Sequence, residues 1–210
     1  MMKKKKLILF DWGHVIQNGS SNKCTVEYAR EMVCRDMKPT NYSKFMKIFD
    51  LNDFWTLNNN NFKAFITNSL IQSGSIKNYD DFVQSYFKQN GKIPYFEDTI
   101  KLIESIQNMD NCYIGILSNI SELDIVQLKE HLNLNKFDYL FLSAYTGIQK
   151  PNNMAYINVE KKVKVPANNI LFIDDSLENI KAANKRGWKT CLATGNNISK
   201  IKFEISSFLK

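Results

Sequence analysis

The sequence has few of the residues on which zinc-bound and disulfide-bonded proteins depend. Its 210 residues include only four Cys and two His. Cys24, Cys34, Cys112 and Cys191 are scattered without a CxxC pair, so neither a zinc site nor a disulfide framework is predicted. Scattered cysteines of this kind favour a reducing compartment, and we expect a cytoplasmic protein.

Long apolar runs are missing as well. The first run, residues 7–10, follows the lysines of residues 3–6 and is interrupted at once by Asp11. A membrane-spanning helix needs ~20 apolar residues, so the sequence predicts no membrane association, and no secretion signal is visible. We interpret residues 3–6 as a solvated tail.

Charge of one sign is in modest excess and is not concentrated. The chain carries 28 Lys and Arg residues against 21 Asp and Glu residues, a formal net charge of +7. The basic residues are mostly Lys and are spread along the chain, so nucleic-acid binding is not expected. The hydrophobic share of 44% is ample for a core, and the length fits one domain, or one domain with an insertion.

The sequence divides into two regions that differ in the spacing of their apolar residues, and the first of them is helical. From about residue 24 to residue 89, apolar residues recur at the spacing of amphipathic helices, and three or four short helices are predicted. The first of them is marked by Val26, Ala29 and Val33. Four aromatic residues in or beside this block are candidates for substrate contacts, but we interpret them as packing residues: Phe54, Trp55, Tyr79 and Tyr95.

The rest of the chain alternates short apolar runs with helical patterns. Such runs are typical of buried strands in a parallel sheet, and we predict strands at residues 7–10, 113–117, 139–142, 170–173 and 190–193. Helices are predicted at residues 99–107, 122–132, 154–163 and 178–186. Ser121 is the expected N-cap of the second helix and Gly187 the C-cap of the last. The alternation predicts an α/β fold with a doubly wound parallel sheet.

The helical block interrupts the α/β pattern directly after the first predicted strand. We therefore predict an α/β core of residues 1–19 and 93–210 with an inserted alpha-helical cap of residues 20–92. Gly91 and Pro94 mark the return to the core. Ligands of open α/β sheets bind beyond the carboxyl ends of the strands, so the cap should act as a lid over that crevice.

Polar residues follow the ends of the predicted strands. Because the carboxyl ends of parallel strands lie at one edge of a sheet, these residues should converge on one crevice: Asp11 and Gly13, Ser118 and Asn119, Lys150, and Asp174 and Asp175. Such a set suits a magnesium ion that bridges protein carboxylates to a phosphate. A carboxylate at the end of the first strand can also attack phosphorus as a nucleophile.

The order and spacing of these residues resemble the four motifs of the haloacid dehalogenase superfamily. The matching segments are Phe10-Asp11-Trp12-Gly13-His14-Val15, Leu117-Ser118-Asn119, Gln149-Lys150-Pro151 and Phe172-Ile173-Asp174-Asp175-Ser176. With the helical block as that superfamily's alpha-helical cap, the resemblance covers the whole chain. It implies a Rossmann-like core, a Mg²⁺ cofactor and hydrolysis of a small phosphorylated metabolite.

The resemblance also implies catalytic roles. Asp11 is similar to the nucleophile that forms an aspartyl-phosphate. Ser118, through its hydroxyl, and Asn119, through its backbone N–H, are implied to bind the transferring phosphoryl oxygens. Lys150 is implied to neutralise charge on both Asp11 and the phosphoryl group.

Four residues are implied to hold Mg²⁺. Asp11 would bind it through its second oxygen and Gly13 through its backbone carbonyl. Asp175 resembles a direct ligand and Asp174 a ligand through water, although the sequence leaves open which is which. Gly13 is also the departure from the superfamily pattern, since most of its phosphatases carry there a second Asp that protonates the leaving alcohol. General acid–base help is worth ~10²–10⁴ in rate.

Gly13 therefore leaves several functions open. An Asp-x-Gly-x-Val motif resembles a subgroup with sugar-phosphate phosphatases and epoxide-hydrolase-like relatives, and a Mg²⁺-dependent phosphatase is the leading interpretation. The alternatives are a metal-independent 2-haloacid dehalogenase, disfavoured by the adjacent carboxylates of Asp174 and Asp175, and a catalytically weakened binding protein. His14 lies one residue beyond the missing acid, but in extended chain it would face away from the crevice, so we expect it to be satisfied or solvent-facing. The substrate and the oligomeric state stay open.

Overall fold

The protein is described from a computed structural model, which covers residues 6–18, 29, 31, 34–35, 37–49, 51–90 and 93–210. Five parallel strands form its sheet: β1 (Lys6–Phe10), β2 (Cys112–Ser118), β3 (Tyr139–Leu142), β4 (Ile170–Asp174) and β5 (Lys189–Leu192). Their order is β3-β2-β1-β4-β5, with β1 at the centre. The predicted doubly wound parallel sheet is confirmed.

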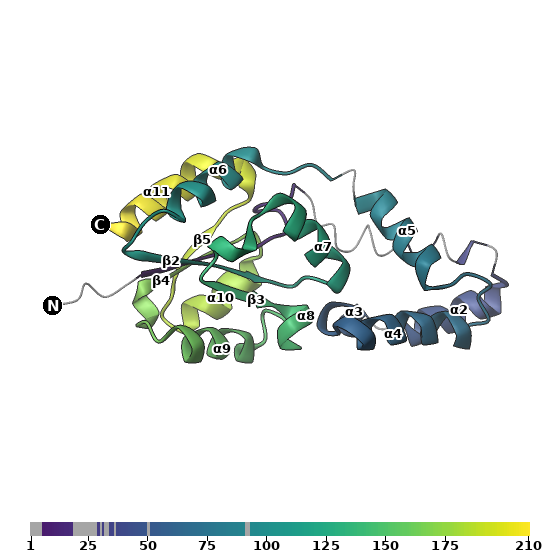
Figure 1. Cartoon of the computed structure of the whole chain (residues 1–210). Coiled ribbons are helices and arrows are strands. Elements are labelled where there is room, and N and C mark those ends of the chain that lie inside the picture. The colour runs from purple at the N-terminus through teal and green to yellow at the C-terminus, as the bar shows by residue number, and fades with distance from the viewer. Residues whose placement is uncertain are drawn as a thin grey trace.

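Helices cover both faces of this sheet (Figure 1). On one face, α6 (Glu97–Ile106), α7 (Glu122–His131) and α11 (Ile198–Leu209) pack against the strands through a shared apolar cluster. On the other face, a second cluster joins the strands to α9 (Asn153–Val163) and α10 (Leu177–Lys185). Because both faces are covered, the strands are continuous apolar runs rather than alternating ones. Residues 7–10 of β1 are fully buried.

The helical insert lies beside the carboxyl edge of the sheet rather than on either face (Figure 1). Its described helices are α2 (Pro39–Ile48), α3 (Leu51–Thr56), α4 (Asn59–Gln72) and α5 (Tyr79–Asn90). They enclose a core of their own, rich in phenylalanine, in which Phe54 is fully buried and Trp55 and Tyr79 pack against it. These three residues therefore pack in the core of the insert, as expected. Of the helix expected around Val26, Ala29 and Val33, only Ala29 is described, and Gly91 lies outside the described residues.

The two connections between insert and core run side by side. The N–H of Asn18 donates to the carbonyl of Pro94 at 2.7 Å, and the N–H of Phe96 donates to the carbonyl of Ile16 at 2.9 Å. Between these bonds, Gln17 and Tyr95 form an antiparallel bridge. The chain therefore leaves β1 and returns to α6 through a short paired segment.

Two helices of the core were not predicted. The first, α8 (Ser143–Thr146), has four residues, too few for a helical period to be visible in the sequence. The second, α11, has Ile201 and Ile205 buried on one face, a spacing of four that is a helical signal. Among the residues that the structure describes, no helix has both the length and the apolar character needed to cross a bilayer.

Candidate active site

The carboxyl ends of β1, β2 and β4 lie at the same level of the sheet. Phe10 of β1 pairs with Ile116 of β2 and with Ile173 of β4, so the residues that follow meet at one edge. A pocket of about 280 Å³ opens there, lined by Asp11, Gly13, His14, Asn119, Lys150, Asp175 and Asn179. Ser118 and Asp174 are buried beside these residues. The structure therefore brings together all the site residues expected from the sequence.

A larger groove of about 620 Å³ runs along β3 and α9. It is lined largely by aromatic and aliphatic residues of the edge strand together with Lys161 and Lys162. None of the polar groups at the strand ends reaches it. The chemistry therefore selects the smaller pocket as the candidate active site.

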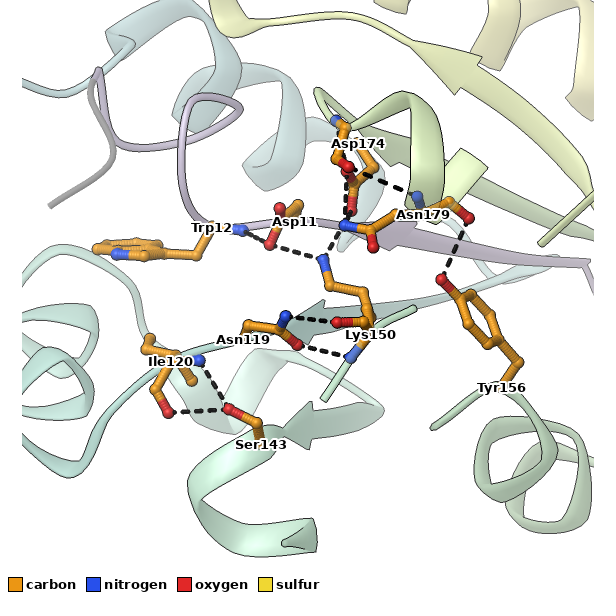
Figure 2. A network of polar contacts seen from close by, with 10 residues as sticks. Asp11, Trp12, Asn119, Ile120, Ser143, Lys150, Tyr156, Asp174 and Asn179 are labelled. Atoms are coloured by element: carbon orange, nitrogen blue, oxygen red, sulfur yellow. Dashed lines mark hydrogen bonds and ion pairs between the residues drawn. The ribbon is translucent and has the colours of Figure 1, made fainter. Parts of the chain in front are cut away.

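Lys150 lies at the centre of the polar network (Figure 2). Its Nζ is 3.0 Å from Oδ1 of Asp11 and 2.6 Å from Oδ2 of Asp174. All three residues are buried, with Lys150 5% exposed and Asp174 fully enclosed. Burial acts to lower the pKa of Lys150, but the two carboxylates outweigh it and raise the pKa above its usual value. The lysine is thus a fixed positive charge held between two acids.

Asp11 follows β1 directly, and for this residue the effect of burial on the pKa outweighs that of the neighbouring positive charge. Burial raises the pKa of its carboxyl to about 7, assisted by Asp174 and opposed by Lys150 and a hydrogen bond from Ser118. Its Oδ1 also accepts a hydrogen bond from the backbone N–H of Trp12 at 2.7 Å. These contacts orient the carboxylate at the mouth of the pocket. A cation bound there would favour the ionised form, which is the form that can act as a nucleophile.

Asp174 is a buried hydrogen-bond acceptor, although it ends β4 at the edge of the sheet where the pocket opens. Oδ1 accepts from the N–H of Ser176 at 2.8 Å, and the side-chain amide of Asn179 lies 3.1 Å from each carboxylate oxygen. Lys150 completes the set of donors. Ser176 caps α10 through its own hydroxyl. Asp174 therefore fixes Lys150 and the start of α10 in place.

Asp175 is the more accessible of the two acids. It is half-buried and lines the pocket, and burial together with Asp174 raises the pKa of its carboxyl, while His14 acts to lower it. Asp11, Asp174 and Asp175 each offer an oxygen, and these oxygens lie within 4.8 Å of one another. Three hard oxygen donors at this spacing can hold a divalent cation. Oxygen donors of this kind suit a hard cation that keeps water or phosphate in its shell, such as Mg²⁺.

Asn119 has a role that the sequence did not reveal. Its side-chain amide donates to the carbonyl of Lys150 at 2.8 Å and accepts from the N–H of Lys150 at 2.8 Å. The next residue, Ile120, is held in the same double manner by the hydroxyl of Ser143, at 2.8 Å and 3.1 Å. Figure 2 shows these two pairings below the lysine. The segment after β2 is thereby joined to the segment that carries Lys150.

Gly13 and His14 form a turn beyond Asp11. Gly13 pairs with Gln17 in an isolated bridge, and His14 has a left-handed backbone with φ of 56°. This conformation overturns the expectation that His14 faces away, because it places His14 on the lining of the pocket. Neighbouring side chains alternate only in an extended backbone, and the backbone at His14 is not extended.

Asn179 accompanies the fourth motif in the sequence, where it was given no role, and the structure places it in the site. It is the third residue of α10, and its side chain reaches back to Asp174. Its carbonyl accepts a hydrogen bond from the buried hydroxyl of Tyr156 at 3.1 Å. An amide in the first turn of a helix, five residues after an acid at a strand end, was the available signal.

The chain resembles known proteins over much of its length. The profile of the haloacid dehalogenase-like hydrolase family matches residues 8–193. The sesquiterpene phosphatase astK of Aspergillus oryzae is 38% identical over 75 residues, which cover 35% of this chain and 38% of that protein. An (S)-2-haloacid dehalogenase of Pseudomonas fluorescens is 31% identical over 85 residues, which cover 40% and 37%. The matched region thus spans less than two fifths of either relative.

Solved structures share the architecture over nearly the whole chain. A haloacid dehalogenase family enzyme of Bacteroides thetaiotaomicron, solved with magnesium and inorganic phosphate, superposes with a TM-score of 0.69. The match covers 91% of this chain and 95% of that one, at 17% sequence identity. At this identity the likeness speaks for the fold.

Proposed function

Because the chain belongs to the haloacid dehalogenase-like hydrolases, we propose that it is a magnesium-dependent phosphatase of a small phosphorylated metabolite, with sugar phosphates among the candidates. The observation that carries the proposal is the arrangement of Asp11, Asp174 and Asp175 around Lys150. It combines a buried nucleophile, a fixed positive charge and a donor set for a divalent cation in one pocket.

The donor set supports a resident Mg²⁺. Asp11 and Asp175 would bind it directly, and Gly13 would add its carbonyl. Asp174, whose oxygens already accept from Lys150, Ser176 and Asn179, would act on the ion at a distance or through water. When bound, Mg²⁺ neutralises charge on the phosphate and on the carboxylates.

Asp11 would carry the covalent chemistry. Its carboxylate attacks phosphorus, an oxygen–phosphorus bond forms, and the bond to the leaving alcohol breaks, which gives an aspartyl-phosphate. Water then attacks the same phosphorus, and the bond to Asp11 breaks to release phosphate. Lys150 compensates the negative charge in both steps, from 3.0 Å away. Ser118 and the N–H of Asn119 would donate hydrogen bonds to the phosphoryl oxygens.

The helical insert, with proposed boundaries 20–92, would serve as the cap of this site. Helices α2 to α5 lie at the edge of the sheet where the pocket opens (Figure 1). Closure of such a lid excludes water and restricts the site to small molecules. A small metabolite is therefore a better substrate than a folded phosphoprotein.

Dehalogenation of a small 2-haloacid is a second candidate, favoured by the identity with the Pseudomonas dehalogenase and by the absence of a second acid at Gly13. The three clustered carboxylates weigh against it, because a single Lys150 balances only one of their charges. A binding protein that retains the pocket without turnover is the remaining candidate.

A screen of phosphorylated metabolites and 2-haloacids, with and without Mg²⁺, decides among these functions. We expect release of phosphate that needs Mg²⁺, with Asp11→Asn as the inactive control. Halide release that is indifferent to chelation would establish the dehalogenase. Tight binding of a phosphorylated compound without turnover would establish the binding protein.

A further inference from the structure

The insert contacts the core at the two elements that follow β2 and β3. The hydroxyl of Tyr86, on α5, donates a hydrogen bond of 2.5 Å to Oδ1 of Asp124, on α7. Leu123 of α7 is buried in the aromatic core of the insert. Helix α3 of the insert contacts α8. The insert is therefore in direct contact with both α7 and α8, and a shift of the insert would act on both helices.

The same two elements hold the segment that follows Ser118. The Oδ2 of Asp124 accepts from the N–H of Ser121 at 3.2 Å and from its hydroxyl at 2.7 Å. Ser143, the first residue of α8, holds the N–H and carbonyl of Ile120. Ile120 and Ser121, which directly follow Ser118 and Asn119, are thus each held by a side chain of an element that the insert contacts.

The two carboxylate oxygens of Asp124 accept hydrogen bonds from different parts of the protein, one from the insert and one from the core. It is only 1% exposed, with Oδ1 facing Tyr86 and Oδ2 facing Ser121. Burial and the nearby carboxylate raise the pKa of Tyr86 well above its usual value, so the phenol stays a donor. Removing that donor leaves a buried carboxylate oxygen without this partner, which costs more than the bond itself contributes. A shift of the carboxylate in response to this loss would carry Ser121 with it, because both the N–H and the hydroxyl of Ser121 donate to Oδ2.

We propose that Tyr86 and Asp124 are positioning residues that couple the placement of the cap to the phosphoryl-binding segment. With the cap docked, Asp124 is held and presents Ser118 and Asn119 in the geometry that binds phosphate. With the cap displaced, the bond to Tyr86 is broken and the segment loosens. The inference rests on the proposed function, because it assigns phosphate binding to this segment.

The test is Tyr86→Phe in the full chain, with inorganic phosphate and saturating Mg²⁺ as the probe. We expect phosphate to bind about tenfold more weakly, as the loss of a hydrogen bond to a buried charged group predicts. For an aryl phosphate, KM should rise by a similar factor while kcat changes less, because Asp11 and Lys150 keep their contacts. Hydrogen exchange at the amides of residues 119–121 should become faster.

Two further variants separate coupling from loss of stability. Ser69 is a buried hydroxyl of α4 that donates to the carbonyl of Phe65 at 2.8 Å, entirely within the insert. Ser69→Ala should lower the melting temperature without changing phosphate binding or exchange at residues 119–121. Asp124→Asn keeps the shape of the side chain. Its amide oxygen can accept from Ser121 while its NH2 donates to the hydroxyl oxygen of Tyr86, so the variant should retain most of the phosphate affinity.

The proposal is overturned if Tyr86→Phe behaves as Ser69→Ala does, with lower stability but unchanged exchange at residues 119–121 and unchanged phosphate affinity. Failure of the proposed function would look different, since the wild-type protein would then neither bind phosphate with Mg²⁺ nor hydrolyse an aryl phosphate. Even in that case, the exchange rates of residues 119–121 in Tyr86→Phe decide whether the coupling exists.

Discussion

Replacement of Lys150 by methionine tests the electrostatic centre of the site. The ammonium group lies 3.0 Å from Asp11 and 2.6 Å from Asp174, and the side chain is 2% exposed. At an effective dielectric constant of about 20, each attraction is about 6 kcal/mol before desolvation is subtracted. Removing one partner of a buried ionic group leaves the others uncompensated and costs about 3–5 kcal/mol. We expect Lys150→Met to lose unfolding free energy in that range without metal.

The assay is urea unfolding at pH 7 with and without Mg²⁺, and Arg186→Met is the matched control. Arg186 pairs with Glu160 at 2.5 Å, but these side chains are 23% and 26% exposed, so their loss should cost only about 1 kcal/mol. Mg²⁺ should restore part of the stability of Lys150→Met, because a cation replaces the missing positive charge. A loss no larger than that of the control, or no response to Mg²⁺, would refute the reasoning.

Four further predictions follow from the site and its surroundings. Asp11→Asn, or chelation of the metal, should lower aryl phosphate hydrolysis at least about 10³-fold; an unchanged rate would remove Asp11 as the nucleophile. Asp175→Ala should weaken Mg²⁺ binding measured by calorimetry while the melting temperature changes little, because this side chain is half-buried; unfolding of the variant would contradict its role as a ligand. Gly13→Asp should raise the turnover of alkyl relative to aryl phosphates, since alkoxide leaving groups need a proton, and a selective alkyl loss in His14→Ala would assign that proton to the histidine; an unchanged ratio in both variants would show that protonation does not limit the rate. Hydrogen bonds from its arginine partner lower the pKa of Glu160 below its usual value, so Glu160→Gln should cost at most about 1 kcal/mol at pH 7, because the pair is partly exposed and screened, and this cost should vanish as the pH falls through the folded-state pKa; a cost that does not change with pH would argue against an ionic origin.

The convergence of the site was predictable because it depends on chain order and sheet geometry alone. Asp11, Ser118 and Asp174 each follow or end an apolar run, and parallel strands present such ends at one edge. Only the tertiary structure shows that Asp174 is fully buried. Two of its donors, Lys150 and Asn179, come from other elements, and the lysine is 24 residues away in the chain.

Other features needed backbone geometry or distant contacts. The position of His14 depends on a left-handed φ that a non-glycine residue seldom adopts, so the usual assumption of extended chain was wrong. The side chain of Asn119 forms hydrogen bonds with backbone groups of a residue 31 positions away in the sequence. Tyr86 donates a hydrogen bond to Asp124, which lies 38 positions away. Periodicity describes one element at a time, and these contacts join elements.

The paired connections of the insert have a topological consequence. Asn18 and Pro94 are hydrogen-bonded neighbours, so the chain between them forms a closed loop that leaves the core and returns to it at one place. The entropy of closing such a loop grows only slowly with its length, and the register of the five strands does not depend on what the loop contains. The same sheet and catalytic edge can therefore carry longer, shorter or unrelated inserts. A protein built in this way can exchange its helical insert while the strand ends of the core stay in place.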